Sequence, residues 1–385
     1  MGRWRTLLLG TLGACLVLSA HSAGGGTELT FRNDARGAYA SYRFKKGDTV
    51  WTDVVRRFTS RTDAVNDAES VKRVLKRSGI ADATTIRTGT EIKIPVELVA
   101  ANFRAVRGAA AAKPLAGVVV ILDPGHGGVD PGAGGRRGVY EDEVVYDIVC
   151  RAKRILEQET AAAVYVTLRD KTRGYAPTPV RTNFPRDRDE YIQTTPVYQN
   201  LDSTVGLHLR WYLANSLYRA ALRRGTPSDK VIFTSFHADD LSRNARGAMV
   251  YVPGAALCKG HYSKTGRTYR KFAEVRERPE VAFTKRTRER SEQRSRELAG
   301  DLLAALRTAR VKVFSNKPVR DRIVRRRAPF VPAVLRYNAV PAKVLIECGN
   351  LNNARDRQNL GDPTFRERVA RAYVEALIAY TSRRP

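Results

Sequence analysis

Short runs of apolar, largely β-branched residues constrain the fold of this chain more than any other feature of its sequence. They occupy residues 118–122, 164–168, 231–234 and 344–346. Continuous runs of this kind are typical of strands that are covered on both faces. Segments with helical periodicity separate them, and this alternation is typical of a mostly parallel sheet flanked by helices. We therefore predict an α/β domain over residues 116–382.

The charge of the chain predicts attraction to polyanions. Its 385 residues include 68 Lys and Arg against 39 Asp and Glu, which gives a formal net charge of +29. Such an excess favours nucleic acid, an anionic membrane or an acidic cell wall as a partner, and composition alone does not choose among them.

The first residues narrow that choice. Arg3 and Arg5 precede an apolar run over residues 7–18, and small residues follow. This order predicts a secretory signal peptide over residues 1–23, and a buried N-terminal helix is the alternative. No other stretch is long and apolar enough to cross a bilayer. Because an exported protein rarely meets nucleic acid, we expect the cell envelope to be the polyanion.

The cysteines leave one question open. Cys15 follows Leu-Gly-Ala, which resembles a bacterial lipobox and would make Cys15 a lipid anchor, although the apolar run continues past it. If Cys15 leaves with the signal peptide, Cys150, Cys258 and Cys348 remain, an odd number that does not indicate a disulfide framework. Cys150 lies in an apolar helical pattern and is expected to be a buried free thiol.

A small unit is expected over residues 39–99, followed by a linker over residues 100–115 that is rich in alanine. Residues 42–44 and 91–95 read as strands. Between them, Lys46-Gly47-Asp48-Thr49 predicts a turn into a helix capped by Asp48 or Thr49, and a second helix is expected around residues 68–77. The unit resembles a LysM domain through the motifs GDTVW and GTEIKIP. That resemblance implies a βααβ fold that binds N-acetylglucosamine-containing glycans, with a structural spacer as the alternative.

Titratable residues stand where the strands of the larger domain end. His126 lies in the motif DPGHGG directly after the first strand, His237 ends the run that begins at Val231, and Glu347 ends the last run. Ligands collect beyond the carboxyl ends of the strands in such sheets. Glu141 stands at the start of a predicted helix, where a carboxylate can also serve only to stabilise the helix, and Glu143 is its competitor.

Two histidines, a carboxylate and a further glutamate match the composition of a catalytic zinc site. Three protein ligands leave a fourth position for water. Zinc lowers the pKa of that water and polarises a carbonyl, while the nearby glutamate transfers the proton.

The motifs DPGHGGVDPGAGG, YEDE, SFHAD and LIECGNLNN, in that order, resemble zinc N-acetylmuramoyl-L-alanine amidases of the amidase-3 type. The resemblance implies that His126, Glu141 and His237 bind Zn²⁺ and that Glu347 is the catalytic acid–base. Arg210 and Asn215 also match, and we interpret them as structural support. Asn350 departs from the family pattern, which implies altered packing of the substrate peptide.

Residues 171–205 and 259–328 match the family poorly, and the basic stretch from 259 to 295 is interpreted as a solvated surface insertion. Whether either segment covers the site, and whether a regulatory protein acts on it, stays open. The resemblance implies hydrolysis of the amide between N-acetylmuramic acid and L-alanine of peptidoglycan by a protein of the periplasm, cell envelope or exterior. A non-catalytic wall-binding protein and a zinc peptidase that cuts within the stem peptide are the alternatives.

Overall fold

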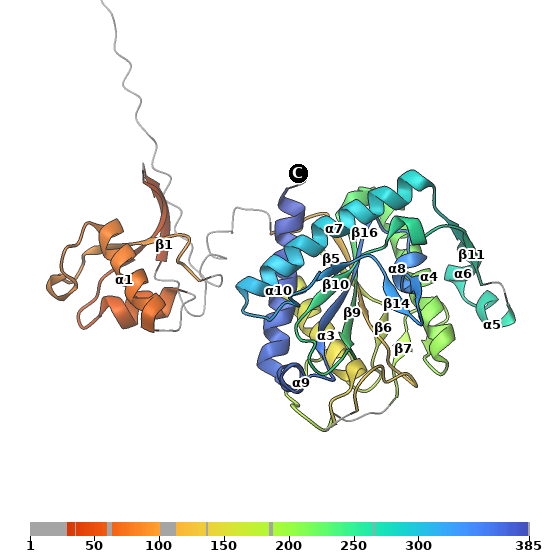
Figure 1. Cartoon of the computed structure of the whole chain (residues 1–385). Helices are drawn as coiled ribbons and strands as arrows, with labels where there is room; N and C mark the ends of the chain where they lie inside the picture. The colour runs from red at the N-terminus through yellow and green to blue at the C-terminus, as the bar shows by residue number, and fades with distance from the viewer. Residues whose placement is uncertain are drawn as a thin grey trace, which may run out of the picture. The chain divides into compact units, whose positions relative to one another are not determined.

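The structure is a computed structural model, and it describes residues 29–34, 36–59, 64–100, 113–135, 138–184, 188–264 and 266–383. The predicted signal peptide, Cys15 and most of the predicted linker lie outside the described residues. The chain divides into two compact units, Met1–Ala112 and Lys113–Pro385 (Figure 1).

The smaller unit contains a three-stranded antiparallel sheet in the order β1-β2-β3. Its elements are β1 (Leu29–Asp34), β2 (Gly37–Arg43), the π-helix η1 (Val50–Arg56), α1 (Ala64–Ser78), the 3-10 turn Ala83–Thr85 and β3 (Glu91–Pro95). The hydroxyl of Thr49 accepts a hydrogen bond from the amide of Thr52 and so caps the first helix, one of the two predicted alternatives. The expected strand-helix-helix-strand order is present, but β1 precedes it and was not predicted.

The larger unit is built on a six-stranded sheet in the order β13-β10-β16-β9-β4-β5. The neighbours β16, β9, β4 and β5 are parallel, whereas β10 runs antiparallel to β16 and parallel to β13, so the predicted mostly parallel sheet is confirmed. The strands are β4 (Val119–Pro124), β5 (Ala163–Val166), β9 (Val231–Asp239), β10 (Met249–Tyr251), β13 (Val319–Arg320) and β16 (Ala342–Asn350).

The sequence predicted a single strand at residues 164–168, but the structure divides this run between two strands. β5 ends at Val166, and Leu168–Arg169 forms β6 in a separate three-stranded sheet with β7 (Tyr191–Ile192) and β8 (Tyr198–Gln199). The hydroxyl of Thr167 bonds to Asp123 at this break, so a single polar residue separates two strands within an apolar run.

Helices cover both faces of the large sheet (Figure 1). Val120 and Leu122 belong to the core that includes α3 (Glu141–Glu159), α7 (Lys285–Thr308) and α10 (Pro363–Ser382). Val119 and Ile121 belong to a second core with α4 (Ser203–Arg223) and α8 (Ala333–Arg336). Successive side chains of a strand point to opposite faces, and both faces are buried, which explains why the strands are continuously apolar. The helix α9 (Ala354–Gly361) follows β16.

The basic stretch at residues 259–295 is more ordered than a solvated insertion, so that interpretation was wrong in part. It forms β11 (His261–Ser263), α5 (Arg267–Arg270), α6 (Ala273–Glu277), β12 (Glu280–Ala282) and the start of α7. Phe272, Val275 and Val281 are buried in one core with residues of α4. Glu277 also accepts hydrogen bonds from Arg219 on α4. A few apolar residues, widely spaced among charges, are enough to pack the segment.

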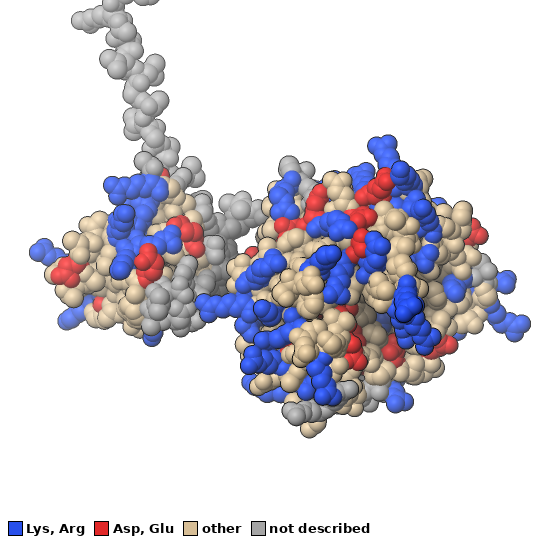
Figure 2. Space-filling model, in the orientation of Figure 1, with Lys and Arg blue, Asp and Glu red and all other residues tan. Residues whose placement is uncertain are grey.

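The remaining elements are short: the strands β14 (Ile323–Arg325) and β15 (Ala328–Phe330) and the 3-10 turns Ser228–Lys230 and Ala255–Leu257. Within the described ranges, no helix combines the length and apolar character needed to cross a bilayer. Lys and Arg side chains are spread over the visible face of the larger unit and outnumber Asp and Glu there (Figure 2).

Candidate metal centre

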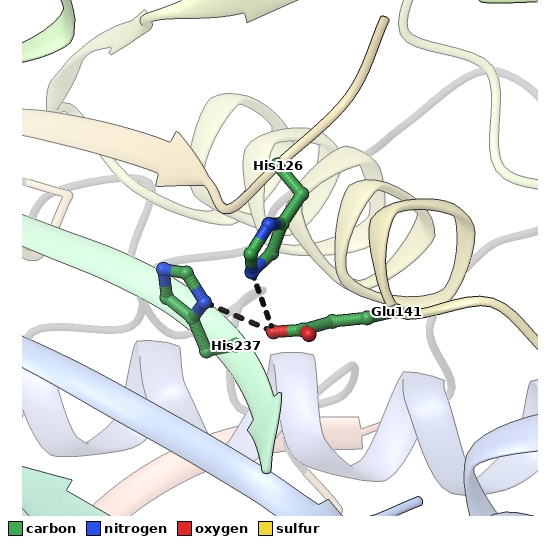
Figure 3. A group of neighbouring side chains, drawn as sticks. All are labelled: His126, Glu141 and His237. Atoms are coloured by element: carbon green, nitrogen blue, oxygen red, sulfur yellow. Dashed lines mark hydrogen bonds and ion pairs between the residues drawn. The ribbon is translucent and has the colours of Figure 1, made fainter. Parts of the chain in front are cut away.

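His126, Glu141 and His237 meet at the carboxyl ends of the central strands. The Oε1 atom of Glu141 lies 3.2 Å from Nε2 of His126 and 2.9 Å from Nδ1 of His237. One ligand atom from each of the three residues lies within 4.8 Å of the other two. Figure 3 shows both imidazole rings pointing toward the same carboxylate oxygen. The structure therefore brings together the three residues that the sequence suggested as metal ligands.

The sheet explains why these residues meet. β4 pairs in parallel with β9, and its last residue, Pro124, lies opposite Phe236. His126 follows two residues after β4, and His237 directly follows Phe236, so both imidazoles emerge at one edge. Glu141 is the first residue of α3, which begins at the same edge. Parallel strands separated by crossovers always present their carboxyl ends together, and this topology sets the spacing of the ligands.

Two glycines leave the space that the three side chains fill. A Cβ atom on Gly125 would lie 2.4 Å from the His237 ring. At Gly132, which has a φ of +64°, a Cβ would lie 2.4 Å from Oε2 of Glu141 and 2.7 Å from the His126 ring. All three distances are far below a normal carbon contact, so the glycines of the motif are required by the close approach of these side chains.

The backbone at His126 is held in an unusual conformation. Its φ is +62°, in the left-handed region that residues with a Cβ seldom adopt. The guanidinium of Arg210 donates hydrogen bonds to the carbonyls of Pro124 and His126 and to Oδ1 of Asp123, the last at 2.9 Å. Arg210 is buried on α4. The interpretation of Arg210 as structural support is consistent with these contacts, because they fix the turn that carries His126.

The charges around the two imidazoles favour a cation. Burial lowers the pKa of His126, but Glu141 and Asp130 outweigh it and raise that pKa to about 10. Burial likewise raises the pKa of Glu141, while His126 and His237 together hold it well below its ordinary value. The buried carboxylate of Glu141 is stabilised by positive charge on the neighbouring imidazoles. A divalent metal ion that replaced the imidazole protons would supply that positive charge instead. The set of two nitrogens and one oxygen fits zinc.

Glu347 stands beside this cluster on the neighbouring strand. In the parallel pairing of β16 with β9, Glu347 lies opposite His237. Its side chain is buried, and burial together with Asp239 and Glu141 raises its pKa well above the ordinary value. Burial also raises the pKa of Asp239 itself to about 6. Glu347 is therefore a carboxyl group that holds a proton readily.

A cavity of about 230 Å³ opens beside His126 and His237. Asn200, Ser203, Thr204 and Leu207 form part of its wall. The end of the poorly matched segment 171–205 therefore borders the cavity. Asn200 also donates a hydrogen bond to the carbonyl of Gly127, which ties this segment to the His126 turn.

The competing carboxylate lies elsewhere. Glu143 is buried in the first turn of α3, where its Oε2 lies 3.4 Å from the guanidinium of Arg173. It takes no part in the cluster of Glu141 with the two histidines. Asn215 bonds to the carbonyl of Tyr337 and the amide of Ala339, and so links α4 to the segment before β16.

The side chain of Asn350 has structural contacts, and its effect on the packing of the substrate peptide stays a prediction. Its side chain is buried, and it bonds to the amide of Leu241 and to the carbonyls of Ser242 and Ala245. It joins the loop after β9 to the end of β16 and does not line the cavity beside His126. The polar side chain that departs from the family pattern at this position therefore has its hydrogen-bond partners within the loop.

His208, His261 and the three described cysteines lie outside the metal cluster. His208 lies on α4, where its Nδ1 accepts a hydrogen bond from the indole of Trp211, and burial lowers its pKa to about 4. His261 is exposed in β11. The prediction for Cys150 is confirmed, since it is a buried free thiol, as are Cys258 and Cys348.

Asp130 and Asp239 were missed by the sequence analysis. Oδ2 of Asp130 lies 3.0 Å from Nδ1 of His126, where it can orient the ring. Asp130 stands within the DPGHGGVDPG motif, four residues after His126, so its position was the available signal. Asp239 lies two residues after His237 on β9. Residues two apart on a strand share a face, so this spacing was the available signal for Asp239.

Comparisons with known proteins identify the family of the larger unit. The Amidase_3 family of N-acetylmuramoyl-L-alanine amidases matches residues 120–379. An uncharacterised cell wall amidase of Bacillus anthracis is 26% identical over 69% of this chain and 36% of its own length, so the chain spans about a third of that relative. The N-acetylmuramoyl-L-alanine amidase AmiA of Escherichia coli is 27% identical over 68% of this chain and 75% of its own length.

Among solved structures, the N-acetylmuramyl-L-alanine amidase Ami1 of Mycobacterium smegmatis is similar to this chain with a TM-score of 0.42 and 18% identity. That similarity covers 70% of this chain and 100% of Ami1. The family match spans the strands β4 to β16 and every residue of the metal cluster. On this basis the chain belongs to the Amidase_3 family of N-acetylmuramoyl-L-alanine amidases.

Proposed function

We propose that this protein is an exported, zinc-dependent amidase that hydrolyses peptidoglycan. The bond it cuts joins the lactyl group of N-acetylmuramic acid to the L-alanine of the stem peptide. The observation that carries the proposal is the cluster of His126, Glu141 and His237 with Glu347 on the adjacent strand. Membership of the Amidase_3 family and the similarity to AmiA support the same reaction.

His126, Glu141 and His237 would hold the zinc ion, and the cavity beside the two imidazoles would admit the substrate. Zinc at such a site lowers the pKa of water and polarises the carbonyl that is attacked. Arg210 and Asp130 hold the His126 turn and ring in place, so that the ligands need little rearrangement when the metal binds.

Glu347 would move the proton. Its raised pKa suits a group that accepts a proton from the attacking water and then releases it to the alanine nitrogen. The water oxygen bonds to the lactyl carbonyl carbon, the carbon–nitrogen bond breaks, and the products are a lactyl carboxylate and a free α-amino group. The burial of Glu347 keeps bulk water away from this transfer.

Digestion of purified sacculi, followed by mass spectrometry of the products, tests the reaction. We expect stem peptides with free L-alanine amino termini and glycan strands without peptides. Fragments cut within the stem peptide would identify a peptidase instead. Unchanged muropeptides from fully zinc-loaded protein would leave only a wall-binding role.

The variant Glu347→Gln tests the proton transfer. The amide has nearly the same shape but cannot accept the proton, so we expect zinc content to stay at the wild-type level while sacculus cleavage falls by about 10² to 10⁴-fold. Zinc content is measured by elemental analysis, and cleavage by release of soluble fragments. Cleavage within a few-fold of the wild-type rate would remove Glu347 from the reaction.

The smaller unit and the charge fit an envelope location. We propose that residues 39–99 form a LysM-like unit that binds the glycan strand, and that the excess of Lys and Arg holds the protein on the anionic wall. Arg77 and Ser78, at the end of α1, have structural contacts in this unit. Arg77 pairs with Asp34, and the hydroxyl of Ser78 bonds to the amide of Lys93.

A further inference from the structure

A second cavity, also of about 230 Å³, lies at the opposite edge of the large sheet from the metal cluster. Ser228 and Pro341 line it, and they precede the parallel strands β9 and β16. The cavity is therefore at the amino ends of the strands whose carboxyl ends carry His237 and Glu347. The two cavities share no lining residue.

Positive side chains dominate this cavity, which we call the α7 pocket. The cationic residues that line it are Arg286, Arg288, Arg290, Arg336 and Lys343. Its described lining contains no Asp or Glu. So many cations around one small cavity repel one another, and they favour a ligand that brings negative charge.

Lys343 is the strongest indication that an anion belongs in the pocket. Its side chain is buried, and its ammonium donates hydrogen bonds to Oγ of Ser291 at 2.6 Å and to the carbonyl of Val340 at 2.9 Å. Both acceptors are uncharged. Burial lowers the pKa of Lys343 from 10.5 to about 7. Lysine is seldom buried without an opposite charge, and a bound anion would supply that charge.

The first turns of α7 also form part of the pocket wall. The helix begins at Lys285 and has no acidic residue in its first turn, so its positive dipole end is not offset there. Thr287 and Ser291, one turn apart, line the pocket; the hydroxyl of Ser291 donates a hydrogen bond to the carbonyl of Pro341, and the hydroxyl of Thr287 lies 2.9 Å from that of Thr284. The Nε atom of Arg288 is buried without a hydrogen-bond partner in the described structure, whereas its Nη1 binds the carbonyl of Ala255.

The rest of the wall is apolar. Tyr218, Phe283 and Leu335 line the cavity together with Pro253 and Pro341. A ligand that fills this space needs an apolar or aromatic part next to its charged group.

We propose that the α7 pocket binds a small organic phosphate whose ester group is apolar or aromatic. Guanidinium groups and an ammonium, next to the positive dipole end of α7, are donors that phosphate oxygens accept from. A phosphate monoester carries two negative charges, so it compensates the charge of several cations better than a single carboxylate does. The ester group would lie against Tyr218, Phe283 and Leu335. This proposal does not depend on the amidase activity, because the pocket is separate from the metal cluster.

Isothermal titration of the full chain in chloride buffer at neutral pH tests the proposal. The probes are phenyl phosphate, inorganic phosphate and benzoate. We expect phenyl phosphate to bind at least about tenfold more tightly than either of the others, a difference of about 1.4 kcal/mol. Equal binding of phenyl phosphate and benzoate would overturn the choice of phosphate, and equal binding of both phosphates would overturn the apolar part.

Variants locate the site. The double variant Arg286→Gln with Arg290→Gln removes two exposed cations of the pocket and should weaken phenyl phosphate binding about tenfold or more. Lys343→Met should do the same. Arg307→Gln is the matched control, since Arg307 is exposed near the other end of the same helix and is not part of the pocket.

Equal affinity in the pocket variants and Arg307→Gln would show unspecific charge attraction and overturn the proposal. Glu141→Gln separates the pocket from the metal cluster. Unchanged affinity in that variant supports the α7 pocket, and loss of binding would place the phosphate at the histidines instead.

Discussion

Glu141 and Glu143 stand two residues apart in the first turn of α3, yet their surroundings differ sharply. Glu141 faces two imidazoles, whereas Glu143 faces the guanidinium of Arg173. Helical residues two apart point in different directions. The same side chain is thus a candidate metal ligand at one position and part of a structural ion pair at the other.

This contrast gives a matched pair of variants. Glu141→Gln removes the charged ligand between the histidines, so we expect the variant to lose at least about 90% of bound zinc, and with it sacculus cleavage. Glu143→Gln should keep its zinc, because it leaves the cluster intact. Elemental analysis of both purified proteins measures the difference, and equal zinc loss in the two would count against the assignment of Glu141.

Lys343 predicts a pH dependence of stability. In the unfolded chain this lysine keeps its proton up to about pH 10.5, whereas in the folded protein burial lowers its pKa to about 7. At this lysine the unfolded state therefore binds more protons between these values, and the contribution of Lys343 to the free energy of unfolding rises with pH across this window. Below pH 7 the cost of burying the charge is present in full.

The variant Lys343→Met lacks this dependence. We expect its free energy of unfolding, relative to the wild type, to fall by about 4 kcal/mol between pH 6 and pH 10. Denaturant titrations of both proteins in chloride buffer at the two pH values measure the change. A difference that stays constant with pH would mean that Lys343 keeps an ordinary pKa in the folded protein.

At the scale of single residues, the sequence indicated the cluster because its motifs follow strand ends. His126 and His237 could be placed by the runs that precede them, and Glu141 by the helix that it begins. Asp130 escaped because its role depends on the left-handed turn at His126, which brings its carboxylate back to the ring. The α7 pocket was not predicted, because Arg336 and Lys343 lie far along the chain from the three arginines of α7 and join them only in the folded protein.

At the scale of elements, the turn between β4 and α3 depends on space as much as on ligands. Gly125 lies against the His237 ring, and Gly132 lies against Glu141 and His126. The sequence predicted the tight turn from its glycines. It could not show which side chains would fill the space above each one, because those side chains come from β9 and α3.

Gly125→Ala should displace His237. The added methyl would lie 2.4 Å from the ring, so the ring must rotate away and we expect zinc affinity to fall about 10 to 100-fold. Competition with a chelator measures that affinity. Gly300→Ala is the control, because an added Cβ at this helical position meets nothing within 4 Å. It should keep zinc and add about 0.5 to 1 kcal/mol of stability.

The strands of the large sheet were predictable because both of their faces are buried, which makes each run continuously apolar. β1 was not predicted, because its six residues include only two apolar ones, Leu29 and Phe31. It pairs with β2 at the edge of the small sheet, and the sequence alone does not show that partner. The segment at 259–295 was misjudged because its buried residues are few and depend on the surface of α4 for their packing.

At the scale of the whole molecule, the net charge of +29 predicts long-range attraction to a polyanion. The excess of Lys and Arg on the visible face in Figure 2 is spread out and not gathered into one patch. Diffuse charge attracts a polyanion over a distance of about one Debye length, and salt screens this attraction.

We expect retention on purified sacculi to fall at least about tenfold when NaCl rises from about 0.05 M to about 0.5 M. Hydrolysis of a short, soluble muropeptide should change much less, because that reaction depends on the metal cluster. Pelleting assays and product analysis give the two readings. Retention that does not respond to salt would show that specific glycan contacts, and not charge, hold the protein on the wall.

The origin of the three candidate ligands has one more consequence. His126, Glu141 and His237 come from the end of one strand, the start of a helix and the end of another strand, and these meet only after β4 has paired with β9 and α3 has packed on the sheet. A chain that is still assembling cannot offer all three at once. The absorbance of a bound ion such as Co²⁺ would therefore report the last stage of folding. Its appearance during refolding would show when β4 has paired with β9 and α3 has packed on the sheet.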